Sequence, residues 1–475
     1  MMGEQIEDFS LDADFECGEI DCIELKNRLS AYPVDTSIAI NSLIENFEKK
    51  QLTQTVSFRK LVPWIKMGER ATHYLHSYPA KLLPQIAHFF LASITLCSQD
   101  DIVLDPFGGT GTVALEAAMS GRVAYYADAN PLARLISSAK TNCINIEEAK
   151  LAHERVLKKF KLSRKSIPPD VVNITHWYTE SSIRQLSRLK AAIDSEPESP
   201  IKDFFWTTFS STVRKSSLAD PKLSVPVRLK LYGNGSQPLD DQKIWTLYDQ
   251  QLLSNCDRQV NFQKMLGTMP NIMCVGNDAR HLCTPDLWNA NFSGMLNNEA
   301  IGLVITSPPY AGAQKYIRAS SLSLGWLDLA SSAELKHLEN ANIGREHFPK
   351  ALYRDIRLTG LSSADRVIKM VFEKNQLRAA IISTYLLEMK AAILEICRVL
   401  KPGGHVVLVI GNNEVCGEAF ESSEYLTQYF LEQGLKLRLK LLDDIKSRGL
   451  MTKRNRAASI ITREWVLLFQ KPEST

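Results

Sequence analysis

The stretch Ile102-Val-Leu-Asp-Pro-Phe-Gly-Gly-Thr-Gly-Thr112 decides the fold of this chain. It begins with a short apolar run, 102–105, that predicts a buried strand. Its glycines predict a tight turn whose backbone can approach a ligand that a Cβ would block. The residues that follow, 112–119, predict a helix. A strand, a glycine turn and a helix in this order are typical of a nucleoside-cofactor loop in an α/β sheet.

The segments on either side continue an α/β pattern. A second strand is predicted at 123–127, and Pro131 fits the first turn of the helix that follows it. The apolar residues of 35–49 have helical spacing. Further strands are predicted at 271–275, 302–305, 405–410, 435–442 and 460–469, with a long amphipathic helix over 386–400. We therefore expect an α/β fold built on a doubly wound sheet.

Two insertions interrupt this pattern, and 475 residues are too many for one ordinary core. The first, 147–268, contains helical pieces and then a part rich in Ser, Thr, Lys and Arg from Thr207 to Lys230. The second, 319–378, has no regular pattern. The other predicted divisions are an acidic N-terminal segment and helix (1–50), the cofactor-binding half of the core (51–146), a core segment with a second motif (269–318) and the C-terminal half of the core (379–475).

The composition is that of an ordinary water-soluble globular protein, 45% hydrophobic and 23% charged, which argues against a disordered or membrane-embedded chain. The apolar stretch 89–97 is too short to cross a bilayer, and no signal-peptide pattern opens the chain. The cysteines include no Cys-x-x-Cys pair, so we expect free thiols in a reducing cytosol. His73 and His76 have no second ligand pair at zinc spacing, so we expect no metal.

Charge is unevenly distributed along the chain. Residues 1–26 contain nine Asp and Glu against Lys26 alone, whereas the whole chain carries a net charge of +3. The remainder is therefore basic, which suits a polyanionic partner because neutralised phosphates supply most of the sequence-independent affinity for nucleic acid. A modest surplus on so large a body also fits simple solubility, so charge alone does not choose between the two.

Asp105 discriminates between the cofactors that the glycine turn can hold. The turn matches G-x-G-x-x-[GA], and Asp128 lies 17 residues beyond Gly111, where a carboxylate can accept both ribose hydroxyls. No Gly-Lys-Ser/Thr follows that would indicate a phosphate-binding P-loop. A carboxylate directly before the turn would repel the pyrophosphate of a dinucleotide and attract the ammonium group of a methionine moiety. S-adenosylmethionine is therefore favoured, the alternative being that Asp105 only caps the helix.

A second motif, Thr306-Ser-Pro-Pro-Tyr310, follows the strand predicted at 302–305. Its two prolines fix φ, so the carbonyls there point in set directions. The Ser307 side chain and the Pro308 carbonyl can accept both hydrogens of an exocyclic amino group, and Tyr310 can stack on a base. Ser-Pro-Pro also occurs in ordinary loops, so this inference depends on the cofactor turn upstream.

Together the two motifs resemble those of the DNA amino-methyltransferases, the family that makes N4-methylcytosine or N6-methyladenine. Residues 105–112 look like the DPF-x-G-x-GT cofactor motif, and 306–310 look like the TSPPY catalytic motif. Four further stretches are similar to segments of this family. Residues 77–81 resemble the segment that closes over the methionine end of the cofactor, and 128–133 resemble the segment that binds its ribose. Residues 277–279 resemble the turn that contacts the adenine, and 398–404 resemble the helix end before the fifth strand. Here the cofactor motif comes first in the chain, which leaves the permutation class open.

The resemblance implies a Rossmann-like S-adenosylmethionine-dependent methyltransferase fold and methylation of double-stranded DNA by base flipping, with cytosine N4 favoured because position 307 is Ser. It also implies a prokaryotic cytosolic location and a cognate restriction enzyme or defence complex. The catalytic residues would be Ser307, Pro308, Pro309 and Tyr310. The cofactor-binding residues would be Tyr78, Pro79, Lys81, Asp105, Pro106, Phe107, Gly108, Gly109, Gly111, Thr112, Asp128, Asn130 and Asp278.

Two basic stretches are candidates for DNA contact, although each can also be a solvated charged face. The preferred one lies in the first insertion and comprises Arg214, Lys215, Lys222, Arg228 and Lys230; the other comprises Lys453, Arg454 and Arg456. The alternatives are an adenine N6 enzyme, an RNA or tRNA base methyltransferase, a nicotinamide oxidoreductase and a catalytically silent DNA-binding subunit. A C5-cytosine enzyme is disfavoured because the sequence contains no Pro-Cys pair.

Overall fold

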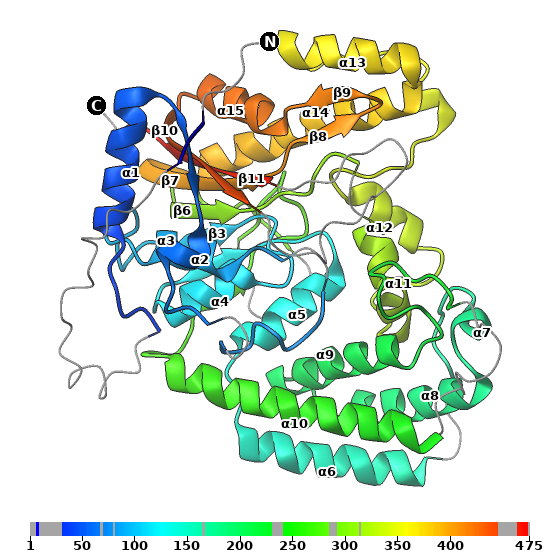
Figure 1. The fold of residues 1–475 in the computed structure, drawn as a ribbon. Coiled ribbons are helices and arrows are strands. Elements are labelled where there is room, and N and C mark those ends of the chain that lie inside the picture. The colour runs from blue at the N-terminus through cyan, green and yellow to red at the C-terminus, as the bar shows by residue number, and fades with distance from the viewer. Residues whose placement is uncertain are drawn as a thin grey trace.

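The computed structural model describes residues 6–8, 31–66, 70–78, 81–163, 167–229, 241–284, 292–312, 315–444 and 463–473. Its main strands are β1 (Ile6–Asp8), β2 (Thr53–Val56), β3 (Val103–Asp105), β4 (Ala124–Tyr126), β5 (Ile272–Cys274), β6 (Ile301–Thr306), β7 (Leu400–Ile410), β10 (Lys436–Asp444) and β11 (Arg463–Gln470). They form one sheet in the order β1-β2-β10-β11-β7-β6-β3-β4-β5 (Figure 1). A separate hairpin consists of β8 (Asn413–Val415) and β9 (Glu418–Phe420).

The sheet is mixed because one strand runs against the others. β11 is antiparallel to β7 and β10, and the remaining pairs are parallel. The strand order reverses between β3 and β6, so the carboxyl ends of these two strands lie at a switch point where α/β sheets bind ligands. The predicted doubly wound, Rossmann-like fold is confirmed.

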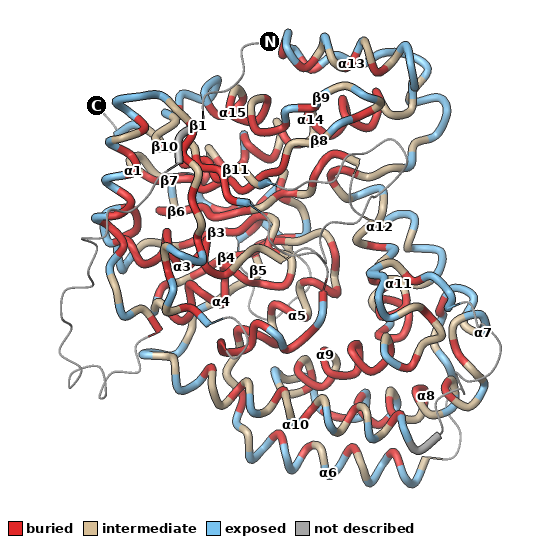
Figure 2. Tube along the Cα trace, viewed as in Figure 1, coloured by how far each residue is buried: buried red, intermediate tan, exposed pale blue. Residues whose placement is uncertain are grey.

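Both faces of the sheet are buried, and the alternation of side chains along a strand explains how (Figure 2). On β6, Leu303 and Ile305 pack in one cluster, whereas Val304 packs in the other. The Leu303 side is covered by α1 (Ser37–Lys50), α2 (Phe58–Leu61), α3 (Pro84–Leu91) and α4 (Thr112–Met119). The Val304 side is covered by α13 (Ser362–Lys374), α14 (Gln376–Val399) and α15 (Ser422–Glu432).

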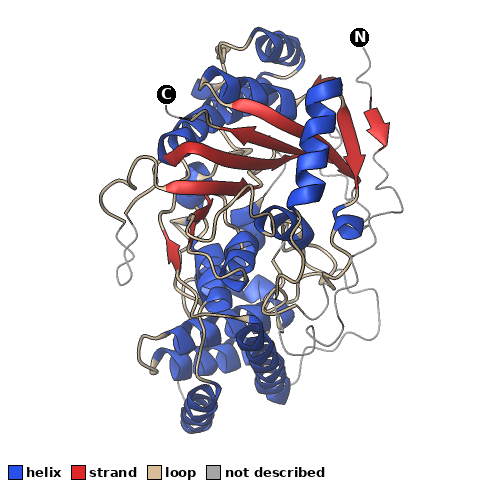
Figure 3. Cartoon of the chain, turned by 90° about the vertical axis from the view of Figure 1, so that its left-hand side faces the viewer, coloured by secondary structure: helices blue, strands red, loops and turns tan. Residues whose placement is uncertain are grey.

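The first insertion is a helical body with a core of its own. It contains α6 (Ile146–Leu162), α7 (Ile174–Trp177), α8 (Glu180–Asp194), α9 (Pro200–Lys215) and α10 (Asp241–Met265), which gather beyond one end of the sheet (Figure 3). Their apolar side chains pack with those of α5 (Pro131–Thr141) around Phe204, Phe209 and Tyr248. The part predicted to be a polar stretch from Thr207 begins inside α9, where Thr207 to Val213 are buried.

The second insertion is more regular than its sequence predicts. The helix α11 (Tyr316–Trp326) begins before it, and α12 (Leu335–Ala341), a 3-10 turn (Lys350–Leu352) and α13 follow. Trp326 is fully buried in the core of the first insertion. The expectation of an irregular segment was therefore wrong for these helices: α11 packs in the core of the first insertion, and α13 buries one apolar face, Ala364, Ile368 and Val371, against the sheet's own core.

Candidate active site

The two central motifs meet at the carboxyl edge of the sheet. β3 and β6 are parallel neighbours, with Leu104 paired to Val304. The Thr306 hydroxyl donates a hydrogen bond to Asp105 Oδ1 at 2.7 Å, across 201 residues of sequence. The last residue of one strand is thus joined to the last residue of the other, and the turns that follow both strands face the same space.

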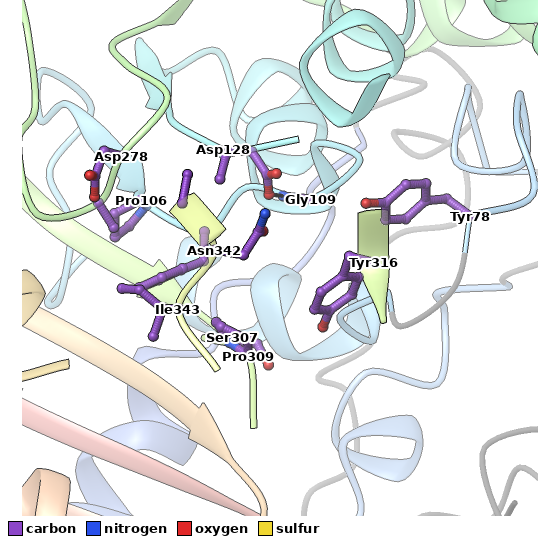
Figure 4. A pocket seen from close by; sticks show the side chains of 14 residues that line it. Tyr78, Pro106, Gly109, Asp128, Asp278, Ser307, Pro309, Tyr316, Asn342 and Ile343 are labelled. Carbon is purple, nitrogen blue, oxygen red and sulfur yellow. Dashed lines mark hydrogen bonds between the residues drawn. The ribbon is translucent and has the colours of Figure 1, made fainter. Parts of the chain in front are cut away.

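That space is an open-mouthed cavity, which together with the solvent at its mouth encloses about 630 Å³ (Figure 4). Eight residues that the sequence predicts for the site line it: Tyr78, Pro106, Phe107, Gly109, Asp128, Asp278, Ser307 and Pro309. Six further lining residues were not predicted: Ala129, Ala279, Tyr316, Ala341, Asn342 and Ile343. The cofactor motif and the catalytic motif therefore border one cavity, and the second insertion supplies part of its wall.

The glycines of the cofactor turn have different tasks. Gly109 has φ +52° and lines the cavity, and a Cβ built there has no contact closer than 4.0 Å, so a side chain would project into open space. Gly111 has φ +69°, and its Cβ would lie 2.9 Å from Ser137 Oγ on α5. Gly109 thus leaves room for a ligand, whereas Gly111 permits the close approach of two helices.

The buried carboxylate of Asp105 and the half-buried carboxylate of Asp128 lie beside the turn. Asp128 accepts hydrogen bonds from the backbone N–H groups of Gly109 at 2.9 Å and Asn130 at 2.8 Å, and burial raises its pKa to about 6. Burial raises the pKa of Asp105 to about 7. Neither carboxylate forms an ion pair with a cation in the described part of the chain. A ligand with a ribose and a positive charge fits this pair, as S-adenosylmethionine does, since its ribose hydroxyls would donate hydrogen bonds to a carboxylate and its ammonium group would supply the missing cation.

Asp278 is held by a cation that the sequence analysis did not single out. Arg280 donates to both Asp278 carboxylate oxygens, at 2.8 to 3.1 Å, and to the carbonyl of Ala341 at 3.2 Å. It also pairs with Glu388 at 3.2 Å, and Glu388 accepts from Arg345 at 2.6 Å. The Asp278 end of the cavity is thereby tied to the wall at 341–343. The spacing of Arg280 two residues after Asp278 was visible in the sequence, but its reach to Ala341 was not.

Other predicted cofactor residues do not line the cavity but hold residues or turns next to it. Asn130 accepts from the Leu132 N–H at the start of α5 and donates to the Tyr78 hydroxyl at 2.8 Å and to Ser320. The Lys81 ammonium donates to the carbonyls of His73 and His76, and burial lowers its pKa to about 8. Gly108 and Thr112 are buried in the turn and in α4. Pro79 lies outside the described residues.

The catalytic motif divides into residues that face the cavity and residues that do not. Ser307 and Pro309 line it, whereas Pro308 and Tyr310 are buried. The Tyr310 hydroxyl donates to Glu464 Oε1 at 2.6 Å. Glu464 stands at the start of β11, and because this strand is antiparallel its beginning lies at the carboxyl edge of its neighbours. Sequence reasoning missed Glu464, since only the sheet order brings it to the site.

Three of the predicted DNA-contacting cations of the first insertion, Arg214, Lys215 and Arg228, have internal partners. Arg214 donates to the carbonyls of Asp220 at 3.1 Å and Leu223 at 2.6 Å, and burial lowers its pKa. Lys215 donates to Gln251 Oε1 at 2.7 Å, and Arg228 approaches His176 Nδ1 at 3.5 Å. Lys222 is exposed. Four members of the two predicted sets lie outside the described residues: Lys230, Lys453, Arg454 and Arg456.

Comparisons with known proteins find similarity to methyltransferases. The family model described as "RMKL-like, methyltransferase domain" matches residues 73–163. The type II methyltransferase M.MvaI of Kocuria varians is 28% identical over 72% of this chain and 77% of its own length. The type II methyltransferase M.BsoBI of Geobacillus stearothermophilus is 22% identical over 90% and 91%. An S-adenosylmethionine-dependent methyltransferase structure from Methanosarcina mazei is 10% identical over 84% and 100%, with a TM-score of 0.29.

The fold, the shared cavity and the type II methyltransferase relatives define the class of this protein. It is an S-adenosylmethionine-dependent methyltransferase, and S-adenosylmethionine is its cofactor. The predicted relationship to the DNA amino-methyltransferases is confirmed at the level of type II methyltransferase relatives. Within the described residues, no group of side chains could hold a metal ion, and no helix is long and apolar enough to cross a membrane.

Proposed function

We propose that this enzyme methylates double-stranded DNA at an exocyclic amino group, and that the amino group is N4 of cytosine. One observation supports the proposal above the others: Ser307 and Pro309 of the catalytic motif line the same cavity as Gly109 and Asp128 of the cofactor turn. An acceptor for a planar amino group therefore stands within the space that holds the methyl donor. The type II methyltransferase relatives support DNA as the substrate.

The chain's own groups then position the amino nitrogen. The Ser307 side chain accepts one of its hydrogens and a backbone carbonyl of the Pro-Pro turn accepts the other, which draws the nitrogen lone pair out of conjugation with the base. The target nucleotide leaves the duplex to reach them, at a cost of about a few kcal/mol. Transfer is direct, with no covalent bond to the protein, and the rate enhancement comes from positioning and from hydrogen bonds that strengthen as the nitrogen pyramidalises.

Adenine N6 is the second candidate, because the same acceptors fit either amino group. Ser at position 307 favours cytosine. An RNA base methyltransferase and a catalytically silent DNA-binding subunit are the less favoured alternatives. A role in a restriction-modification or defence system forms part of the proposal, with a cognate restriction enzyme as the partner and the prokaryotic cytosol as the location.

The test is incubation with methyl-labelled S-adenosylmethionine and fragmented genomic DNA, followed by digestion to nucleosides and mass spectrometry. Labelled N4-methylcytosine is expected, whereas N6-methyladenine would replace the base in this proposal. Ser307→Ala should abolish the transfer and leave cofactor affinity nearly intact. The matched control is Ser363→Ala, since Ser363 is exposed on α13. Transfer to RNA alone, or no transfer by the native protein, would contradict the proposal.

A further inference from the structure

The loop 345–358 of the second insertion begins beside the catalytic motif and ends against α14. Gly344, just before it, has φ +82°, and a Cβ there would lie 3.2 Å from the Tyr310 carbonyl oxygen and 3.8 Å from the Tyr385 ring. At the other end, the Ser383 hydroxyl donates to the Arg357 carbonyl at 2.6 Å. Ser383 and Tyr385 lie two residues apart on α14. The start of the loop therefore lies near Tyr385 and the catalytic motif, and its end is bonded to the same helix at Ser383.

Ion pairs hold the first residues of this loop. Arg345 pairs with Glu388 at 2.6 Å, and Glu346 pairs with Lys315 at 3.3 Å and Arg378 at 3.4 Å. The three residues before Gly344 in the cavity wall, 341–343, continue directly into this base. The part of the loop beyond the ion pairs consequently projects from a rigid base next to the place where the proposed target nucleotide enters.

The rest of the loop exposes cations and apolar side chains together. Lys350, Arg354 and Arg357 are exposed, and within the described part of the chain none of them pairs with a carboxylate. Leu352 and Ile356 are 44% and 36% exposed. Large apolar groups among free cations, beside a catalytic cavity, are a surface that favours a polyanionic partner with an apolar interior.

We propose that this loop binds duplex DNA next to the target nucleotide. Lys350, Arg354 and Arg357 contact phosphates, and Leu352 and Ile356 contact base steps at the position that the extruded nucleotide leaves. Apolar side chains inserted at base steps unstack them, which lowers the cost of extrusion. The inference rests on the proposed function, because it names the surface by which that same site holds its DNA. If the loop binds a protein partner instead, the variants described next will bind and methylate DNA like the native protein.

The phosphate contacts are tested with the triple variant Lys350→Ala, Arg354→Ala, Arg357→Ala. Binding of fragmented genomic duplex is measured over a range of salt concentrations with S-adenosylhomocysteine present. Each phosphate contact contributes about 0.9 to the slope of log affinity against log salt, so the slope should fall by about 2 to 3. The matched control removes three exposed cations by Lys49→Ala, Arg59→Ala and Lys60→Ala on α1 and α2, and should leave the slope unchanged; α1 lies across the molecule from α12 (Figure 1).

The apolar contacts are tested with Leu352→Ser and Ile356→Ser together. Methyl transfer at saturating DNA should fall at least about tenfold, which corresponds to about 1.4 kcal/mol less stabilisation of the extruded state. Cofactor affinity should match that of the native protein in both variants. An unchanged rate would overturn the apolar part, and a loss of cofactor affinity would show a structural role instead.

The native protein is assayed first, so that two kinds of failure are distinguished. If it neither binds nor methylates DNA, the proposed function fails. If it does both and the loop variants behave like the control, the loop inference alone fails and the DNA lies elsewhere.

Discussion

The two insertions of this methyltransferase differ in what they share with the active site. The first, α6 to α10, packs around its own apolar core and docks on α5. The second supplies Asn342 and Ile343 to the cavity and touches the catalytic motif through Gly344. The first is thus a body beside the site, whereas the second forms part of it.

Their cations differ in the same way. Arg214 and Lys215 of the first insertion bind carbonyl and amide oxygens of their own body. Lys350 and Arg354 of the second are exposed and free of carboxylates in the described part of the chain. A count of cations along the sequence favours the first insertion, because it cannot distinguish a cation that holds a loop from one that is available to a phosphate. Under the proposal above, the availability of the cations and not their number decides which surface binds DNA, although Lys222 and Arg228 of the first insertion are exposed as well.

The largest effect is expected at Gly344, where the second insertion meets the catalytic motif. Gly344→Val must displace either the cavity wall or Tyr310, because the added Cβ would lie 3.2 Å from the Tyr310 carbonyl oxygen. A displacement of about 1 Å at such a place can cost about a hundredfold in rate, so methyl transfer should fall by at least that factor. The control is Gly360→Val, since φ is +87° there and no atom lies within 4 Å of the Cβ. An equal loss in both variants would show that backbone strain alone is responsible.

A smaller effect is expected from Glu388→Ala, which removes the shared partner of Arg280 and Arg345. The half-buried Arg280 and Arg345 would then no longer be joined through one carboxylate, so the cavity wall would be less firmly held and the Kd for S-adenosylmethionine should rise about tenfold, or about 1.4 kcal/mol. Calorimetric titration measures the change. The matched variant in the first insertion is Glu196→Ala, which breaks the pair with Arg155 at 2.6 Å. It should lower thermal stability and leave the Kd for S-adenosylmethionine unchanged. A raised Kd would contradict the inference that only the second insertion forms part of the cofactor site.

A pH series distinguishes the contribution of Asp105 to cofactor binding from that of the cavity wall at 341–343. The pKa of Asp105 is raised to about 7 by burial, and an ammonium group bound beside it would lower that pKa again. Binding therefore releases a proton, and cofactor affinity is complete above about pH 7 and falls as the pH drops through 7, by about tenfold at pH 6. Asp105→Asn should flatten the profile at a weaker affinity. Glu388→Ala should keep the native slope; a flattened profile there would assign the pH dependence to the wall.

The smallest effects distinguish single cations of the two insertions. Arg354→Ala should lower the salt slope of DNA binding by about 0.9 and leave folding stability unchanged. Arg214→Ala should leave the slope unchanged and lower the free energy of unfolding by about 1 kcal/mol, because two carbonyls lose their donor. Urea unfolding and salt-dependent binding measure both quantities. The opposite pair of results would indicate that the first insertion, and not the loop 345–358, binds the DNA.

Much of the site was accessible from local sequence. The helix at 112–119 has the predicted bounds, and strands were predicted within a few residues of β3, β4, β5, β6 and β10. Eight predicted residues line the cavity, because a glycine turn and a Pro-Pro turn carry their geometry in a few adjacent residues. The missed residues, among them Glu464, Tyr316 and Asn342, reach the site from elements that no local pattern places.

The sequence by itself thus determined the α/β class, the glycine turn and the Pro-Pro turn, since each turn is written in a short run of backbone-restricting residues. Tertiary structure alone decided that β11 brings Glu464 to Tyr310, that Arg280 ties Asp278 to Ala341, and which cations stay exposed. The physical reason is range. Turn and strand propensities act over a few residues, whereas ion pairs and burial depend on which distant segments the sheet order brings together.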